Sequence, residues 1–181
     1  NALAMITKLR EAACSATLAD KALSIRSSKL DVLLDKLTQI IQQGNRVLVF
    51  SQFTSFLDMA IPEMEAAGIH DYFYLNGSTP VRDRSKMVEE FQNGHKSVFL
   101  VSLKAGGLGL NLTGANYVIH LDPWWNPAIE QQATDRAYRI GQKQKVTVYH
   151  LIAENTIEEK ILRLHQTKRS LADSLLQDTD M

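Results

Sequence analysis

Two arginines, Arg136 and Arg139, have the type and spacing needed to bind phosphate oxygens. Asparagine followed by proline at 126–127 is typical of the start of a helix. If this helix continues past residue 139, Gln132, Arg136 and Arg139 lie four and then three residues apart and share one face. Two guanidinium groups one turn apart present rigid sets of N–H donors suited to phosphate. The alternative is an ordinary exposed helix, on which Asp135 and Arg139 form an ion pair of small energetic consequence.

A glycine-rich segment at residues 102–112 is a second candidate for phosphate binding. It contains Lys104 and three glycines, and it ends in Gly109, Leu110, Asn111 and Leu112. Bare backbone amides beside a lysine suit an anion, although a structural turn is the alternative. The phosphate-binding loop G-x-x-x-x-G-K-[ST] occurs nowhere in the sequence, nor does a Walker B acidic pair or an evident anchor for magnesium. We therefore expect the chain to assist phosphoryl transfer but to be inactive as an ATPase alone.

The elements that position these residues alternate between strand and helix. Buried-strand patterns occur at residues 46–50, 72–75, 98–101, 117–121 and 146–151. Helical patterns precede or separate them at residues 2–13, 28–44, 53–67 and 79–94, and the third helix is kinked or restarted at Pro62. Ser28 and Thr79 are the expected N-caps of the second and fourth of these helices. The alternation predicts an α/β domain, a parallel sheet flanked by helices. Ligands gather at the carboxyl ends of such strands, where the polar segments 51–54, 76–79 and 102–112 lie.

We divide the chain into residues 1–26, a helix and connector; residues 27–153, the α/β domain; and residues 154–181, a C-terminal amphipathic helix and tail. A capping box at 156–159 begins the last helix. Its apolar stripe consists of Ile157, Ile161, Leu164, Leu171 and Leu175. We expect this stripe to dock back on the domain and the basic residues of the same helix to be solvated.

Composition excludes several classes of protein. The 181 residues carry 20 Lys+Arg and 20 Asp+Glu, so the chain as a whole is not a strongly basic nucleic-acid binder. One cysteine, Cys14, cannot form an internal disulfide, and we expect it to be a small buried residue in a reducing, intracellular compartment. No apolar run approaches the ~20 residues of a membrane span. Because the sequence begins with Asn1, we expect a fragment of a longer protein, monomeric by itself.

Several segments, in register, resemble the second RecA-like lobe of a Swi/Snf-family DNA-dependent ATPase. They are residues 47–53, 77–79, 104–112, 122–127 and 135–142. The resemblance covers about residues 27–175, and residues 3–14 resemble the helix that joins the two lobes of the family, so that residues 1–26 would come from the preceding lobe. Three residues depart from the family pattern: Leu103 stands in place of a common Thr, Asn76 of a common Asp, and Tyr138 of a common His.

The resemblance implies that ATP, with Mg²⁺, lies in a cleft between this lobe and a first lobe that holds most of it. Arg136 and Arg139 would then be arginine fingers that reach the γ-phosphate, and Gly109, Asn111 and Gln132 would face the nucleotide. A second set would track double-stranded DNA through its phosphates: Ser51, Gln52, Gly77, Ser102, Lys104 and Trp124. Trp124 and Trp125 resemble an aromatic pair beside the DNA groove, and we expect one of the two to serve core packing instead.

The first hypothesis for function is the second motor lobe of an ATP-dependent translocase on double-stranded DNA, of the chromatin- or complex-remodelling type. Its location would be a nucleus or a bacterial cytoplasm. The alternative is a module that binds nucleic acid or protein and has no nucleotide role, in which case the two arginines contact DNA phosphates. A strand-separating helicase would share the same motor chemistry, and the sequence does not specify the load that is moved.

Overall fold

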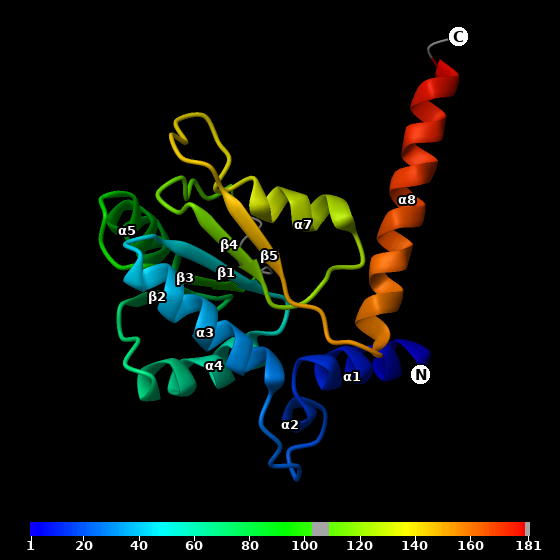
Figure 1. The fold of residues 1–181 in the computed structure, drawn as a ribbon, viewed down its shortest axis with the longest axis horizontal. Coiled ribbons are helices and arrows are strands. Elements are labelled where there is room, and N and C mark those ends of the chain that lie inside the picture. The colour runs from blue at the N-terminus through cyan, green and yellow to red at the C-terminus, as the bar shows by residue number, and fades with distance from the viewer. Residues whose placement is uncertain (103–108, 180–181) are drawn as a thin grey trace.

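A computed structural model of the chain describes residues 1–102 and 109–179, and for 177–179 the backbone alone. Its centre is a five-stranded parallel sheet in the order β2-β3-β1-β4-β5 (Figure 1). The strands are β1 (Val47–Ser51), β2 (Tyr72–Leu75), β3 (Val98–Ser102), β4 (Tyr117–His120) and β5 (Thr147–His150). The helices are α1 (Ala2–Cys14), α2 (Ala16–Ala19), α3 (Ser28–Gln42), α4 (Thr54–Ala66), α5 (Val81–Gln92), α7 (Pro127–Thr134) and α8 (Ile157–Thr179).

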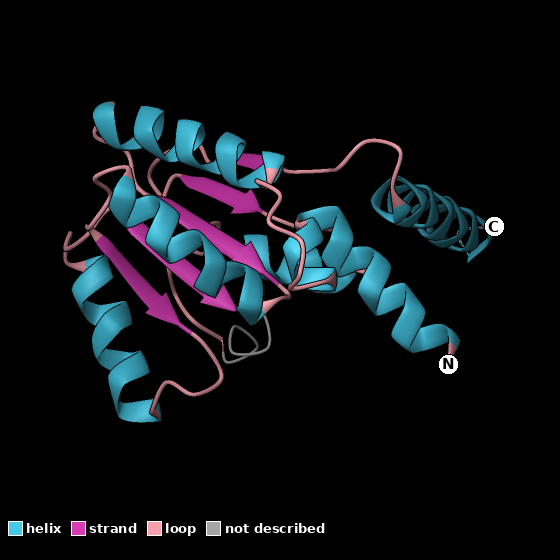
Figure 2. Cartoon of the chain, turned by 90° about the horizontal axis from the view of Figure 1, so that it is seen from below, coloured by secondary structure: helices cyan, strands magenta, loops and turns pink. Residues whose placement is uncertain are grey.

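Helices cover both faces of the sheet, which confirms the predicted α/β class (Figure 2). On β1, Val47 and Val49 pack under α3 and α4, whereas Leu48 and Phe50 belong to the opposite layer, beside α5 and α7. Side chains of a strand alternate between faces, so a strand covered on both sides must be apolar throughout. All five residues of β1 and all five of β3 are buried.

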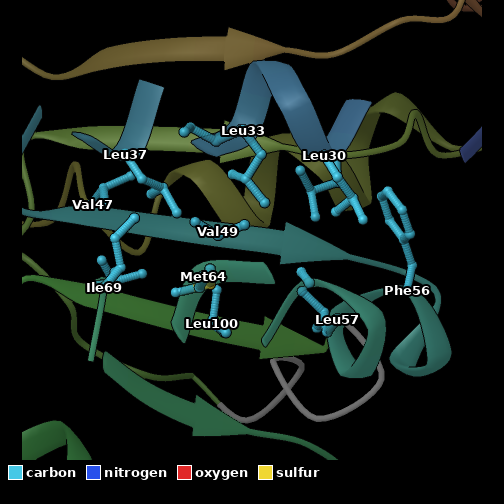
Figure 3. Packing of buried hydrophobic residues seen from close by; sticks show 14 of the residues in the cluster. Leu30, Leu33, Leu37, Val47, Val49, Phe56, Leu57, Met64, Ile69 and Leu100 are labelled. Atoms are coloured by element: carbon cyan, nitrogen blue, oxygen red, sulfur yellow. The ribbon is translucent and has the colours of Figure 1, made fainter. Parts of the chain in front are cut away.

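The α3 and α4 layer is the larger part of the core. Figure 3 shows Leu30, Leu33 and Leu37 of α3 over Val49 of β1. From the other helix, α4, the fully buried side chains of this layer are Phe56, Leu57 and Met64. A restart of α4 at Pro62, one of the two predicted alternatives, is wrong, because a single helix runs through this residue.

Two predicted helix starts are wrong by one residue for reasons visible in the hydrogen bonds. The Ser27 hydroxyl, rather than that of Ser28, accepts from the Leu30 amide and caps α3. At α5 the Thr79 hydroxyl accepts from the amide of Asn76 instead of capping the helix, and Pro80 takes the cap position. In both cases the sequence placed the helix correctly and misjudged only its terminal residue.

Among the residues of α8 whose side chains are described, the buried ones lie in its first half. Glu158, Ile161 and His165 are buried, whereas Leu171 is 61% exposed. In Figure 1 the helix projects away from the sheet, and its C-terminal end lies far from every other element. The expected docking of the apolar stripe is therefore right at Ile161 and wrong at Leu171. Among the described residues, no helix is long and apolar enough to cross a membrane.

Candidate functional site

The two arginines lie in a tight turn that follows α7, which we call the arginine turn (residues 135–142). The predicted helix through residue 139 is wrong, because α7 ends at Thr134. Beyond it the backbone amides bond three residues back: Arg136 to Ala133, and likewise 137 to 134 and 138 to 135, at 3.0–3.2 Å. Residues three apart eclipse one another in such a turn, so Arg136 and Arg139 share a side although they share no α-helix.

Both guanidinium groups converge on Gly109. A Cβ placed on this glycine would lie 3.9 Å from Arg136 Nη1 and 4.0 Å from Arg139 Nη2. Arg139 Nη1 also donates to the Gly109 carbonyl at 3.0 Å, and the Leu112 amide donates to the Arg136 carbonyl at 3.1 Å. Gly109 has φ +68°, a conformation that favours glycine. The structure thus brings together three residues that the sequence analysis assigned to phosphate and nucleotide.

The arginine pair carries more positive charge than its surroundings neutralise. Burial lowers the pKa of Arg136, the neighbouring Arg139 lowers it further, and Asp135 opposes both. Asp135 itself accepts a hydrogen bond from Gln131 at 3.0 Å, and among the described residues no ion pair joins it to Arg139. Arg136 Nε is buried with no hydrogen-bond partner in the described part of the chain. Two close cations with unused donors favour an anionic ligand.

The other two predicted nucleotide residues take different positions. Asn111 lies with Gly109 and Leu110 at a hollow of about 560 Å³ beside α5. Gln132 is exposed on α7, and within the described part of the chain no hydrogen bond connects it to either arginine. Because the helix ends two residues before Arg136, the spacing that was to place Gln132 on the same face does not apply.

The predicted DNA contacts Ser51 and Ser102 are completely buried, which contradicts a direct role for their side chains. They end the adjacent strands β1 and β3, directly opposite one another. The Ser51 hydroxyl donates to the Asp122 carboxylate, and the Ser102 hydroxyl lies 3.1 Å from that of Thr54. In this conformation both serines hold the loops that follow the carboxyl ends of β1 and β3, and their hydroxyls are not available to a phosphate.

Gln52 lies at the same edge and is only partly buried. Its side-chain nitrogen donates to the Pro123 carbonyl at 2.8 Å, and its side-chain oxygen accepts from the guanidinium of Arg10. The Arg10 guanidinium also stacks over the rings of Phe53 and Trp125, 5.3 and 5.7 Å from their centroids. These contacts of Arg10 hold α1 against the carboxyl end of β1, in the region that the resemblance assigned to DNA.

Gly77 is exposed in the turn between β2 and α5, where its carbonyl accepts from Arg84 at 3.3 Å. Lys104 lies outside the described residues, as does most of the glycine-rich segment (residues 103–108). The predicted anion cradle of that segment therefore rests on the sequence, apart from Gly109.

Of the two tryptophans, Trp124 is the one that packs against the core, beside the apolar cluster that includes Phe50. Its backbone amide donates to Glu130 at 3.1 Å, and its carbonyl contacts His165 of α8. The expectation that one of the pair packs in the core thus applies to Trp124, the residue we had assigned to DNA. The ring of Trp125 lies against Arg10 instead.

The sequence analysis missed a buried carboxylate at the sheet edge. Asp122 accepts from the Ser51 hydroxyl and from the Gln52 amide, the latter at 3.2 Å. Burial raises the pKa of Asp122 to about 6, while those hydrogen bonds and the charge of Lys29 oppose the shift. The available signal was that the segment 122–127 begins with a polar residue, Asp122. The hydrogen-bond partners of Asp122 could not be predicted, because they depend on the register of the strands.

A polar network also supports α7 from below. The rings of His120 and His150 stack with centroids 5.0 Å apart, and His120 Nε2 lies 2.8 Å from the Thr134 hydroxyl. Burial lowers the pKa of His120 to about 4, so this ring is neutral near pH 7. His150 Nδ1 lies 3.1 Å from Glu130 Oε1. In the described part of the chain, no group of three or more His, Cys, Asp or Glu side chains is placed to hold a metal ion.

The site therefore has two separate parts. Ser51, Gln52 and Asp122 lie where β1 and β4 end, whereas the arginine turn contacts residues that precede β4 and β5. In Figure 1 the connection after α7 lies near the end at which β4 begins, whereas α7 itself begins near the end at which β4 finishes. Of these residues, the sequence had placed only Ser51 and Gln52 at the carboxyl ends of the strands, together with the glycine-rich segment.

Comparison with known proteins identifies the class. The sequence profile of the helicase conserved C-terminal domain matches residues 28–141. The chain is 48% identical over 143 residues to the human chromatin-remodeling ATPase INO80, covering 78% of this chain and 9% of INO80. It is 45% identical over 154 residues to the Arabidopsis thaliana protein CHROMATIN REMODELING 8, covering 84% of this chain and 13% of that protein.

The same relationship holds in three dimensions. The crystal structure of the C-terminal part of the Fun30 ATPase domain superposes with a TM-score of 0.72 at 39% identity, covering 77% of this chain and 45% of that one. This chain thus belongs to the helicase conserved C-terminal domain family and is the second RecA-like lobe of a Swi/Snf-family ATPase. It spans a small part of the length of its relatives.

Proposed function

We propose that this lobe supplies two arginine fingers, Arg136 and Arg139, to ATP in a motor that translocates on double-stranded DNA. The observation that carries the proposal is the convergence of both guanidinium groups on Gly109, with one buried donor unused among the described residues. A triphosphate is the ligand that such a concentrated positive charge fits. Relatives named as ATPases or remodelling proteins support the same chemistry.

In this proposal the chain binds no nucleotide by itself strongly enough for turnover. ATP and its magnesium ion are held mainly by the first lobe, and closure of the two lobes brings the arginine turn to the γ-phosphate. The guanidinium groups then stabilise charge that develops on the phosphoryl oxygens. Their positions are fixed before closure by the bonds of Arg139 to Gly109 and of Leu112 to the Arg136 carbonyl, so little ordering is needed on binding.

The DNA-facing surface is the sheet edge that carries Gln52 and the exposed turn at Gly77, together with Lys104. Ser51 and Ser102 act there through the loops they hold, because their hydroxyls are buried. Asn111, which lines a hollow with Gly109, would contact the nucleotide from this lobe. The motor works inside the cell, as the chromatin-remodelling names of its relatives suggest.

The test measures DNA-stimulated ATP hydrolysis in the full-length protein. Arg136→Ala and Arg139→Ala should each lower kcat by about 10³–10⁵-fold, the range for arginine fingers in related phosphoryl-transfer enzymes. Arg82→Ala, which removes an exposed arginine on α5, is the control and should hydrolyse ATP normally. Normal turnover in both finger variants, together with the loss of salt-dependent DNA binding, would instead establish a binding module without a nucleotide role.

A further inference from the structure

Gln142 joins the arginine turn to residues 113–115, which follow the glycine-rich segment. Its side-chain nitrogen donates to the Ala137 carbonyl at 2.8 Å, inside the arginine turn. The same nitrogen donates to the carbonyls of Thr113 and Ala115, both at 2.9 Å, in the segment that leads into β4. One partly buried carboxamide therefore bridges two stretches that are more than twenty residues apart.

The orientation of this carboxamide is fixed by its other atom. Gln142 Oε1 accepts from the Gln144 amide at 3.0 Å. If the group were reversed, its oxygen would face three carbonyl oxygens and its nitrogen would face an N–H donor. A glutamine side chain has two N–H hydrogens, so one of them is shared between two of the three carbonyls, and the side-chain oxygen is also used.

The backbone brings Gln142 to this position through a glycine turn. The Gln142 amide donates to the Arg139 carbonyl at 3.1 Å, and Gly141 between them has φ +103°. A positive φ at the third residue of a four-residue turn strongly favours glycine. The turn that carries Arg139 therefore reverses the chain and places Gln142 next to Ala137.

The connection has a second support on its other side, so Gln142 attaches the arginine turn to a fixed body. The Gly114 amide donates to Gln92 of α5 at 2.7 Å, and Gln92 donates to the Thr113 hydroxyl at 2.9 Å. Arg46 donates to the Gly114 carbonyl at 3.2 Å and to carbonyls at the end of α5. Residues 113–115 are thus held by α5 and by the start of β1.

We propose that Gln142 is a positioning residue, which sets the height and direction of Arg136 and Arg139 over Gly109 by bonding the arginine turn to residues 113–115. The inference rests on the proposed function of the two arginines. Gln142 touches neither guanidinium group and acts only through the backbone. Its loss leaves both arginines in place chemically and lets the turn shift relative to Gly109.

The experiment compares Gln142→Met with Gln142→Asn in the full-length protein. Methionine keeps the length of the side chain and removes both donors, whereas asparagine keeps the donors with a shorter reach. The control is Gln144→Met, the same change on an exposed glutamine two residues away, whose contribution to the site is its backbone amide. Steady-state kinetics of DNA-stimulated ATP hydrolysis, DNA affinity and thermal unfolding are measured for each variant.

Gln142→Met should lower kcat on the order of 10²-fold, the effect of misplacing a catalytic group by about 1 Å, while KM for ATP and DNA affinity stay near wild type. Gln142→Asn should recover part of the loss, and Gln144→Met should match wild type. Wild-type kcat in Gln142→Met overturns the proposal. So does unfolding of both Gln142 variants, because the residue would then support the whole domain and not the arginine turn.

Arg136→Ala and Arg139→Ala in the same assay distinguish a failure of the proposed function from a failure of the positioning role of Gln142. If these two variants hydrolyse ATP normally, the proposed function itself fails. If they lose turnover and Gln142→Met keeps it, the arginine fingers stand and only the positioning role of Gln142 is refuted.

Discussion

Replacing Lys29 with methionine should break the buried ion pair that joins α3 to α8. Lys29 Nζ lies 2.6 Å from Glu158 Oε1, and the two side chains are 6% and 1% exposed. The same ammonium donates to the Leu121 carbonyl at 2.6 Å, just past the end of β4. Methionine has a similar length and no charge, so the substitution leaves the carboxylate buried without its cation.

The cost follows from the burial of the remaining charge. Removing one partner of a buried ion pair typically destabilises a protein by about 3–5 kcal/mol. The loss is increased because the Leu121 carbonyl also loses its donor. The double variant Lys29→Met/Glu158→Gln should regain at least half of the lost stability, because the glutamine is neutral and its carbonyl can still accept from the Ala153 amide, as Glu158 does at 2.9 Å.

The assay is urea unfolding of the 181-residue chain followed by circular dichroism, with linear extrapolation to water. The control is Lys86→Met, which removes an exposed pair on α5 whose Lys86 Nζ and Glu90 Oε1 are 3.8 Å apart. The control should change the unfolding free energy by less than about 0.5 kcal/mol. A Lys29→Met effect no larger than the control would refute the role of this pair, as would a double variant less stable than the single one.

Two further predictions concern the sheet edge and α8. Burial raises the pKa of Asp122 from 3.8 to about 6, so its favourable contribution is complete below pH 3.8 and lost as the pH rises through 6. The unfolding free energy of wild type minus that of Asp122→Asn should therefore fall by about 3 kcal/mol across this window, and a flat difference in urea titrations would contradict it. Ile161→Ala, at a fully buried position of α8, should cost about 2–5 kcal/mol in the same unfolding assay. Leu171→Ala, at a position 61% exposed, should cost less than about 1 kcal/mol, and equal losses would show that α8 docks along its whole length.

The strands could be predicted from the sequence because burial on both faces leaves a continuous apolar run. β2 lies at the predicted residues, and β3 extends the prediction only by Ser102. Ser102 is polar yet fully buried, since its hydroxyl meets Thr54 across the sheet edge. A polar residue at the end of an apolar run has no local signal that separates a buried hydrogen-bonded position from an exposed one.

The position of the two arginines on one side of the chain was predicted on partly wrong grounds. The sequence indicated an α-helix through residue 139, in which residues three apart share a face. The structure replaces its last turn with bonds between residues three apart, and that geometry also places Arg136 and Arg139 on one side. The same change removes Gln132 from the group, because a spacing of four no longer returns to the same side.

The long-range polar contacts could not be predicted. Ser51 and Asp122 are 71 residues apart and meet only because β1 and β4 pair in parallel with Phe50 opposite His120. The apolar pattern sets which face a strand residue occupies but not which strand is its neighbour. The resemblance assigned Ser51 to DNA, whereas its hydroxyl is used inside the protein.

The separation of the two parts of the site constrains how DNA and ATP could influence one another in this lobe. Helix α7 begins after Trp124 and Trp125, near the edge assigned to DNA, and ends at the arginine turn. Its eight residues span about 12 Å. Two of its residues bond to the chain around β4: Glu130, in the middle of the helix, accepts from the Trp124 amide, and the hydroxyl of Thr134, at its end, bonds to His120. If DNA binding displaced the carboxyl ends of β1 and β4, α7 would therefore move as a unit. The bonds of Gln142 to residues 113–115 would then move the arginine turn together with β4.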